Sequence, residues 1–362
     1  MGDLRVELGE RSYNIYIQKG LLNRVAQDIS TQFHPTSVCI VTDTNLSALY
    51  LSPLEADFKR LGVPNCSFVF QAGEASKNFA VLEQLCDCMI QQKMDRSSML
   101  IALGGGVVGD LTGFAAAIFK RGISYVQIPT SVVAQTDSSV GGKTGVDFGG
   151  AKNMLGAIHQ PKAVYIDPDV LQTLPARFLQ DGLGEVVKYA LLSGGALYDR
   201  VLALQSPEDF LRDDGFIIES CVDYKRRLVE EDERDTGSRM LLNLGHTVGH
   251  SVESYFGYGR YSHGEGVSIG LVEILRYAVH NCNLNHEILE QTCALLQRLN
   301  LPVALPERSE RIFASIVQDK KCTGASIRVV LPYAPGDVRI CTVNTKDFMD
   351  YLCKDLSEKG VF

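Results

Sequence analysis

Residues 98–109 of the chain read SMLIALGGGVVG. The first part is a short apolar run, typical of a buried strand in a parallel sheet, and it leads directly into three consecutive glycines. The segment after the glycines, to about Lys120, has a helical pattern. A strand that ends in a glycine-rich turn before a helix directs bare backbone N–H groups at a bound phosphate. This stretch therefore predicts an α/β fold.

The sequence around this stretch repeats the same alternation. Two short strands joined at Gly9-Glu10 are expected within residues 5–17, and further strands at 37–42, 66–70 and 125–128. Helical patterns lie between the later strands, from 78 to 92 among others. Because strands that alternate with helices form parallel sheets with right-handed crossovers, we expect a Rossmann-like parallel sheet.

The pattern changes after Asp167. Apolar residues at three- and four-residue spacing predict helices at 176–192, 207–230, 243–255, 266–281, 286–298 and 309–318. One hairpin, from 327–331 to 338–343, interrupts them. A length of 362 residues fits two domains of ordinary size. We expect an α/β domain over residues 1–172 and a mainly α-helical domain over 173–362.

Composition limits the possible partners of the chain. Apolar residues make up 45% and charged residues 22%, which is ordinary for a globular protein. The net charge of −8 argues against binding to nucleic acid or to a membrane surface. An anionic small-molecule substrate would therefore need a local pocket of cations.

The ten cysteines are scattered from Cys39 to Cys353 without a CxxC pair, so neither a disulfide framework nor a structural zinc site is expected. Cys86 and Cys88 are two apart in a helical segment and should point in different directions. An alternating strand pattern begins by Leu4, so no signal segment is expected. The sequence also has no apolar run of membrane length. These features predict a cytoplasmic protein with reduced thiols.

Residues 104–109 satisfy the pattern GxGxxG between a strand and a helix. Such a turn often reflects only close packing, and the acidic residue expected some twenty positions later is missing. Asp43, at the end of an earlier strand, could hold an adenosine ribose instead. The residues indicate a dinucleotide site that departs from the standard Rossmann order.

The longest polar and glycine-rich stretch is 130–153, which opens at the end of a strand. It carries Asp137, Lys143, Lys152 and Asn153, and a long loop in a compact domain is usually functional. A mobile surface loop is the alternative, but the apolar residues within the stretch do not favour it.

Three of the seven histidines lie between positions 246 and 263. His246 and His250 are four apart in a helical segment and share one face, whereas His263 is expected in a glycine-flanked turn. Two imidazoles and one carboxylate leave a zinc-like ion with positions open to substrate. The alternative is a pair of ordinary histidines. The string HTVGH lacks the glutamate of the HExxH helix, so protease chemistry is not supported.

Other polar residues could complete such a site. Glu185 and Lys188 are three apart on one helix face, although a surface ion pair would explain them equally well. Further polar residues are Lys225, Arg239, Asn243 and the run Asp319-Lys320-Lys321. All of these residues together supply one carboxylate for a metal and a group of cations for an anion.

Six segments make the sequence recognisable. They are GGGVVGDLTGFAAA, the IPTS…AQTDSSVGGKTGVD stretch, GAKNMLGAIHQP, LPARFLQDGLGEVVKYALL, NLGHTVGHSVE and SHGEGVSIG. Together they resemble the 3-dehydroquinate synthase family, from about Asp43 to the DKK run at 319. The resemblance implies an N-terminal NAD-binding α/β domain, a C-terminal α-helical domain that binds Zn²⁺ or Co²⁺ and substrate, and a homodimer.

The family's functional residues carry over by motif. The metal ligands would be Glu185, His246 and His263, while His250 would contact substrate. The NAD site would comprise Asp43, Glu74, Lys77, Gly105, Gly106, Val107, Val108, Gly109, Asp110, Thr130, Ser131, Lys143, Lys152 and Thr173. The substrate site would comprise Asp137, Lys143, Asn153, Lys188, Lys225, Arg239, Asn243, His250 and either Lys320 or Lys321. Ser131 replaces a usual threonine and Gly184 a usual alanine, and neither change removes a needed group.

The implied reaction converts 3-deoxy-D-arabino-heptulosonate 7-phosphate to 3-dehydroquinate. The reaction begins with a transient oxidation at C5 by NAD, which is followed by β-elimination of phosphate. The hydride then returns, the ring opens and an aldol reaction closes the new ring. The metal would act as a Lewis acid on the C4 and C5 oxygens. Lys143, Arg239 and a lysine of the DKK run would hold carboxylate or phosphate.

Three other functions compete with this one. A cyclase that makes valiolone-type rings from sedoheptulose 7-phosphate is disfavoured by HTVGH, because such relatives tend to lose the second histidine. A metal-dependent polyol or alcohol dehydrogenase would release NADH and leaves the cations unexplained. A non-enzymatic NAD-binding regulator would explain neither the metal triad nor the cations.

Overall fold

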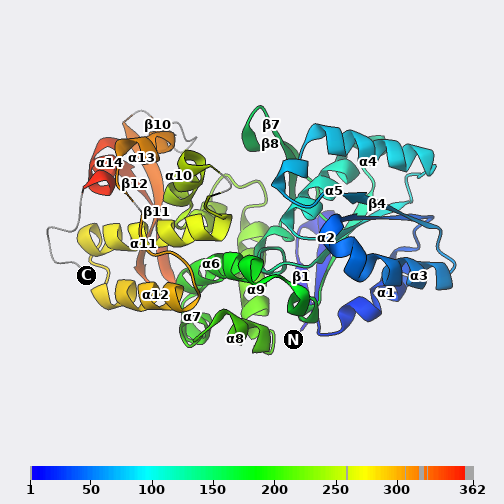
Figure 1. The fold of residues 1–362 in the computed structure, drawn as a ribbon, viewed down its shortest axis with the longest axis horizontal. Coiled ribbons are helices and arrows are strands. Elements are labelled where there is room, and N and C mark those ends of the chain that lie inside the picture. Colours follow the sequence, from blue (N-terminus) through cyan, green and yellow to red (C-terminus); the bar gives the residue numbers. More distant parts are fainter. Residues whose placement is uncertain (1, 258–259, 306, 318–321, 324, 355–362) are drawn as a thin grey trace. The chain divides into compact units, whose positions relative to one another are not determined.

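The computed structural model describes residues 2–257, 260–305, 307–317, 322–323 and 325–354. The chain folds into two compact units, and each is described by itself (Figure 1). The first unit comprises Met1–Leu174 and Asp214–Arg234, and the second comprises Pro175–Asp213 and Asp235–Phe362.

The sequence predicts a single domain boundary at 172/173. In the structure, residues 214–234 also belong to the first unit. The predicted helix at 207–230 is two helices, α8 (Pro207–Arg212) and α9 (Phe216–Glu231). Contacts to the first unit hold α9 in place, since the Glu7 N–H donates to Glu230 Oε1 at 2.8 Å. An amphipathic pattern shows that a helix has a buried face but not which core buries it.

The core of the first unit is a seven-stranded sheet in which only β1 is antiparallel to its neighbour. The strands, in their order across the sheet, are β1 (Leu4–Val6), β2 (Tyr13–Ile17), β9 (Ala163–Ile166), β6 (Ser124–Pro129), β5 (Met99–Gly104), β3 (Val38–Asp43) and β4 (Asn65–Phe70). The predicted parallel α/β sheet is confirmed, and β9 is a strand that the sequence reading missed.

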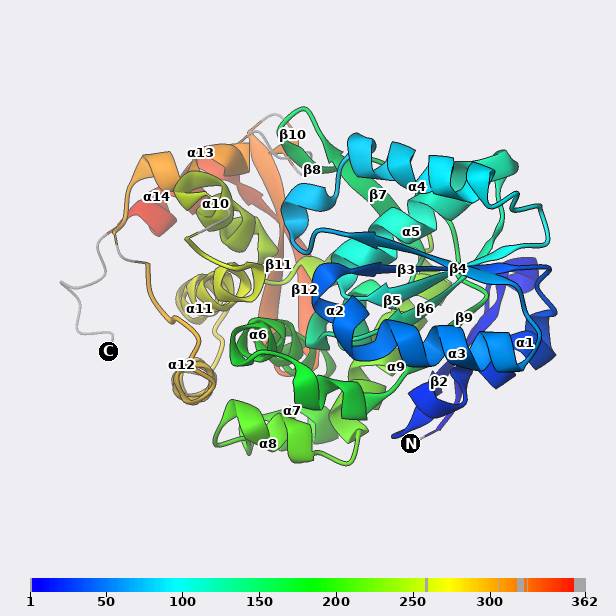
Figure 2. The same ribbon diagram turned by 45° about the vertical axis from the view of Figure 1, so that its right-hand side comes forward.

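Helices cover both faces of this sheet (Figure 2). Alternate side chains of β3 divide between them, with Val38 and Ile40 in one hydrophobic cluster and Cys39 and Val41 in the other. The first cluster lies under α1 (Val25–Phe33) and α3 (Ser52–Arg60), and the second under α4 (Phe79–Gln91) and α5 (Gly106–Ile118). Because both faces are buried, the strands read as continuous apolar runs.

The polar stretch 130–153 differs from the predicted loop. It contains a helical turn, Ala134–Ser138, and a hairpin of β7 (Lys143–Phe148) and β8 (Ala151–Ile158). Gly149 and Gly150 form the tip with φ of 62° and 81°, values that glycine adopts without strain. The glycine pair at the tip and the polar residues of β7 therefore account for the loop-like composition.

The second unit is mainly helical, as predicted. Its helices, besides α8, are α6 (Ala176–Ser193), α7 (Gly195–Leu202), α10 (His246–Phe256), α11 (His263–Asn281), α12 (His286–Arg298), α13 (Glu310–Val317) and α14 (Thr345–Cys353). An antiparallel sheet runs in the order β10 (Cys322–Thr323), β11 (Ser326–Ala334) and β12 (Asp337–Asn344). Among the described residues, no helix is both long and apolar enough to cross a membrane.

Glycines let the three helices that carry the histidines and Glu185 approach backbone to backbone. A Cβ on Gly264 of α11 would lie 1.7 Å from Asp181 O of α6, and one on Gly270 would lie 2.0 Å from Gly245 O. A Cβ on Gly184, where the family usually has alanine, would lie 2.5 Å from Gly264 O. These contacts set the positions from which the metal-ligand side chains start.

Candidate functional site

Glu185, His246 and His263 converge in the second unit. Each offers one ligand atom, and these atoms all lie within 4.8 Å of one another. The Nε2 atoms of His263 and His246 lie 2.9 Å and 3.2 Å from the same oxygen, Glu185 Oε1. His246 and His263 are the first residues of α10 and α11, so His263 begins a helix and does not lie in the predicted turn. Two imidazole nitrogens and one carboxylate oxygen are a donor set that suits zinc or cobalt.

The remaining ring nitrogens have partners that orient the two histidines. His246 Nδ1 donates to Leu244 O at 3.2 Å, and His263 Nδ1 lies 3.0 Å from Glu253 Oε1. Such contacts fix the tautomer and leave Nε2 available to a metal. The sequence reading did not single out Glu253, although it follows His246 by seven positions and His250 by three, which places it on the same helix face.

Lys188 lies beside Glu185, the carboxylate among the predicted metal ligands. Its Nζ is 2.6 Å from Glu185 Oε2, and both side chains are 1% exposed, so a surface ion pair is excluded. Burial alone would raise the pKa of Glu185, but Lys188 and the two histidines hold it well below its usual range. Burial would lower the pKa of His263, yet its hydrogen bonds to Glu185 and Glu253 raise it to about 10. The site therefore favours positive charge at the place where a cation would bind.

Other predicted substrate residues of this unit lie near the histidines in the chain. Arg239 and Asn243 belong to a short helix, Ser238–Asn243, and the Arg239 side chain is buried. His250 is exposed, and its ring centroid lies 5.2 Å from that of His246. His250, Glu253 and His263 also lie within 4.8 Å of one another, so ligand distance alone does not separate the expected role of His250 from that of a ligand. Lys320 and Lys321 lie outside the described residues.

The glycine turn lies in the first unit, where β5 leads into α5. Gly105 is the N-cap of α5, and its Cβ would lie 3.3 Å from Ser131 Oγ. A Cβ on Gly109 would lie 2.6 Å from Gln127 Oε1, so this glycine permits close packing of helix on strand. Thr130 N donates to Gly104 O at 3.1 Å, which brings the ends of β5 and β6 together. The free N–H groups of the first helical turn, Gly106 to Val108, fit a phosphate.

Asp43 lies at the end of β3, the strand beside β5. Its Oδ1 accepts from Asn45 N at 2.9 Å and Leu46 N at 3.2 Å, so the carboxylate caps a helical turn. Because neighbouring parallel strands end at the same edge, Asp43 and the glycine turn lie at the carboxyl edge of the sheet, where α/β proteins bind ligands.

Lys77 joins residues predicted for cofactor and for substrate. Its side chain is 5% exposed and lies 2.6 Å from Asp110 Oδ2 and 3.8 Å from Glu74 Oε1. The same Nζ donates to Asn153 Oδ1, on β8. Burial would lower the pKa of Lys77, but Asp110 and Glu74 raise it, so the lysine stays charged.

The remaining predicted residues of the first unit are spread over several elements. Lys225 of α9 pairs with the Asp137 carboxylate and donates to Asp137 O at 2.7 Å. The Thr173 and Tyr50 hydroxyls are 2.6 Å apart, and Tyr50 was not predicted. Lys143 and Lys152 lie on the hairpin, Lys143 exposed and Lys152 half-buried. The predicted residues thus form two groups, one in each unit.

Two family models match the chain. The model described as 3-dehydroquinate synthase N-terminal matches residues 67–181, and the model described as 3-dehydroquinate synthase C-terminal matches residues 182–322. Every residue predicted as a metal ligand lies in the second match.

Similar proteins extend the match to almost the whole chain. A 3-dehydroquinate synthase of Clostridium acetobutylicum is 40% identical over 97% of this chain and 99% of its own. One of Streptococcus sanguinis is 41% identical over the same shares. Among solved structures, 2-epi-5-epi-valiolone synthase from Streptomyces hygroscopicus subsp. jinggangensis, with NAD⁺ and Zn²⁺ bound, is 26% identical, has a TM-score of 0.85 and covers 98% of this chain and 99% of its own. The two family models and these identities show that the chain belongs to the 3-dehydroquinate synthase family.

Proposed function

We propose that the chain converts 3-deoxy-D-arabino-heptulosonate 7-phosphate to 3-dehydroquinate and phosphate, a carbon–oxygen lyase reaction of the shikimate pathway. The observation that carries this proposal is the match of both family models, which together span residues 67–322. The reaction makes a precursor of the aromatic amino acids, and its cofactors are NAD and a divalent cation, Zn²⁺ or Co²⁺.

When bound, NAD takes up and returns a hydride and the cation polarises substrate hydroxyl oxygens. We assign the cation to Glu185 Oε1 and the Nε2 atoms of His246 and His263, because these atoms converge and the other ring nitrogens are already engaged. NAD is assigned to the carboxyl edge of the first sheet, where Gly105 leaves room for a pyrophosphate at the start of α5.

The chain's own residues bind and orient the anionic substrate. Lys188, fully buried beside Glu185, offers Nζ hydrogens to a substrate oxygen near the cation. Arg239 and Lys143 supply positive charge for carboxylate and phosphate in a protein whose net charge is −8. Lys77 holds Asn153 in place by donating a hydrogen bond to the side-chain oxygen of Asn153. The departing phosphate can accept the C6 proton itself, so the elimination needs no separate protein base.

The test is phosphate release from the heptulosonate phosphate with NAD in catalytic amount. A synthase returns the hydride to the same substrate before product leaves, so phosphate should appear without net NADH. Sedoheptulose 7-phosphate should release none. NADH that accumulates with time beyond one per site would identify a dehydrogenase, and turnover of sedoheptulose 7-phosphate alone would identify the other cyclase.

A substrate analogue provides a sharper test of the order of events. With the ring oxygen replaced by carbon and the phosphate by a non-cleavable phosphonate, the reaction should stop after oxidation. Absorbance of bound NADH should then rise to no more than one per site. An analogue that produces no bound NADH at all, although it binds, would contradict oxidation before phosphate loss.

We also propose that the protein is a homodimer in the cytoplasm, as the family resemblance implies. Light scattering on the purified protein should give twice the chain mass of 39.7 kDa. A mass of one chain at micromolar concentration would contradict the dimer. Cell fractionation should place the protein with cytoplasmic enzymes, and recovery in the membrane fraction would contradict that location.

A further inference from the structure

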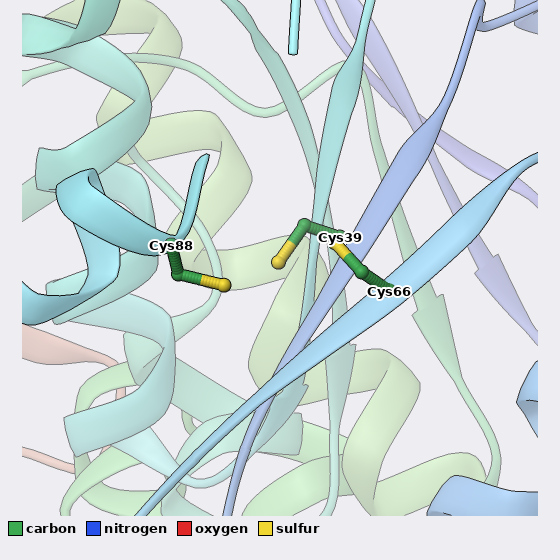
Figure 3. A group of neighbouring side chains, drawn as sticks. All are labelled: Cys39, Cys66 and Cys88. Atoms are coloured by element: carbon green, nitrogen blue, oxygen red, sulfur yellow. The ribbon is translucent and has the colours of Figure 1, made fainter. Parts of the chain in front are cut away.

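Three cysteines of the first unit come together, and none of them is assigned to the reaction. Cys39 on β3, Cys66 on β4 and Cys88 on α4 each offer a sulfur, and the three sulfurs lie within 4.8 Å of one another. Figure 3 shows Cys88 reaching from its helix toward the two strand residues. Cys39 and Cys66 are directly paired in the parallel register of the sheet. We call these residues the thiol cluster.

The fold explains why the sulfurs face one another. Cys39 and Cys66 project from the sheet face that α4 covers, and both belong to the hydrophobic cluster on that side. Cys86, two positions before Cys88 on α4, is not among the three sulfurs, as expected for a helix. Ordinary packing would explain three small apolar residues here, but it gives no reason for three sulfurs to meet.

A group of three sulfurs suits a bound cation better than a disulfide. A disulfide joins only two sulfurs, at about 2.05 Å, and would leave the third thiol out. Three thiolates around one ion at about 2.3 Å each stand roughly 4.0 Å apart, and the three sulfurs here all lie within 4.8 Å of one another.

The chemistry of the ligand atoms selects the kind of ion. The group contains sulfur alone, with no carboxylate or imidazole. Soft thiolate ligands select thiophilic ions such as Cu(I), Cd(II) and Zn²⁺, whereas magnesium and calcium require oxygen. Zinc in structural sites is almost always held by four ligands, so a group of three sulfurs favours the softer ions. Cys39 is fully buried while Cys66 and Cys88 are half-buried, so two sulfurs offer an entry path and the third lies deeper.

We propose that Cys39, Cys66 and Cys88 form a second cation site, which binds one thiophilic d¹⁰ ion such as Cu(I) or Cd(II). The ion replaces the thiol protons, which leave to solvent, and no electron transfer is involved. It connects β3 and β4 with α4 and thereby stabilises the sheet edge that carries Asp43. The site is independent of the proposed reaction.

The experiment uses the full-length, zinc-loaded protein under a phosphine reductant. It is titrated with Cu(I) in the presence of a competing chelator, and separately with Cd(II), and desalted. The wild type should retain one ion more than its zinc, and X-ray absorption at the metal edge should show sulfur neighbours only. Cys88→Ser and Cys66→Ser should each weaken binding at least tenfold, whereas the matched control Cys86→Ser should not. The Glu185→Gln variant should keep the additional ion, which separates this site from the histidine centre.

A measurement on the wild type alone protects the test against variants that fail to fold. The bound ion should shield Cys66 and Cys88 from alkylation, read by peptide mass spectrometry, and leave Cys86 as reactive as before. It should also raise the melting temperature as its concentration rises. The proposal is overturned if no additional ion is retained, if both serine variants bind it as the wild type does, or if nitrogen or oxygen dominates its neighbours.

Discussion

Glu253 holds the ring of a predicted metal-ligand histidine, His263, at 3.0 Å. We predict that Glu253→Gln lowers zinc affinity by about 10- to 100-fold, because an amide orients the His263 ring less strongly than a carboxylate does. Glu185→Gln should abolish stoichiometric zinc binding. Elemental analysis after dialysis against a chelator series measures both.

His286→Gln is the control for this prediction. His286 begins α12 and pairs with Glu290 on the surface, outside the predicted site. It should bind zinc as the wild type does. Unchanged affinity in Glu253→Gln would show that the carboxylate does not act through His263.

Anion binding can be tested one cation at a time. Arg239→Ala and Lys143→Ala should each lower kcat/KM by roughly 100-fold or more, because an anion that loses its partner in a desolvated site costs several kcal/mol. Lys162→Ala, at a lysine outside all motifs, should have little effect. Circular dichroism should confirm that the Arg239 variant folds, since that side chain is buried. Equal, mild losses at all three positions would contradict the roles assigned to Arg239 and Lys143.

Among the elements, the contact between α6 and α11 tolerates the least change. Gly264→Ala would place a Cβ 1.7 Å from a backbone oxygen, which cannot move aside as a side chain can. We expect a loss of about 3 kcal/mol or more in the free energy of unfolding, together with weaker zinc binding. Denaturant titration measures the first effect.

Gly266→Ala in the same helix is the matched control. Its Cβ would lie 3.1 Å from the Glu253 side chain and from Gly249 O, contacts that need only small shifts. It should cost clearly less than Gly264→Ala. If both cost the same, close backbone contact does not determine the position of α11.

The end of α9 carries a pH-dependent contact within the first unit. Arg11 Nη2 lies 2.7 Å from Glu233 Oε2, and Gln160 donates to Glu233 Oε1 at 3.0 Å. The hydrogen bond from Arg11 holds the pKa of Glu233 below its usual value. A carboxylate whose pKa is lower in the folded than in the unfolded protein stabilises the fold. This contribution is fully present above the pKa of the unfolded state and is lost as the pH falls through the pKa of the folded state.

Glu233→Gln should therefore be less stable than the wild type near neutral pH. The difference in the free energy of unfolding should shrink as the pH falls below about 4.5, the ordinary pKa of glutamate. Urea titrations at several pH values measure it. A difference that stays constant from neutral to acid pH would contradict the role of the charge.

Elements with an apolar pattern could be predicted from the sequence, and those made by pairing could not. Most buried parallel strands read as apolar runs, so the α/β core and the helical half could be predicted. Strand β9 is the exception, because its buried apolar run has only four residues. Strand β8 is not buried, since its exposed side chains include Met154 and Ile158, and its structure comes from pairing with β7. The spacing of the histidines suggested a metal site, and the three predicted metal ligands came from the family motifs. Glu253 did not, because only the fold shows that it faces His263.

At the scale of the whole molecule, α9 belongs to the first unit. In the sequence, residues 175–213 of the second unit separate it from the rest of the first unit. We predict that residues 1–174 alone fold poorly, whereas 1–174 joined to 214–234 by a flexible linker of about 15 residues fold stably and bind NAD. The reason is that Asp137 needs Lys225, and Glu230 accepts from the Glu7 backbone. Thermal unfolding and NAD titration compare the two fragments. Equal stability would show that α9 is dispensable to the first unit.

The same connectivity governs the order of events during synthesis. Residues 175–213 leave the ribosome after most of the first unit but before the helix that completes it. A nascent chain between these points carries an unfinished sheet domain and the apolar helix α6, whose partners α10 and α11 have not yet been translated. The first unit can therefore complete its fold only once residue 234 has emerged, and the second unit waits longer still for its later helices. Chaperone contacts should concentrate on nascent chains that end between residues 174 and 234.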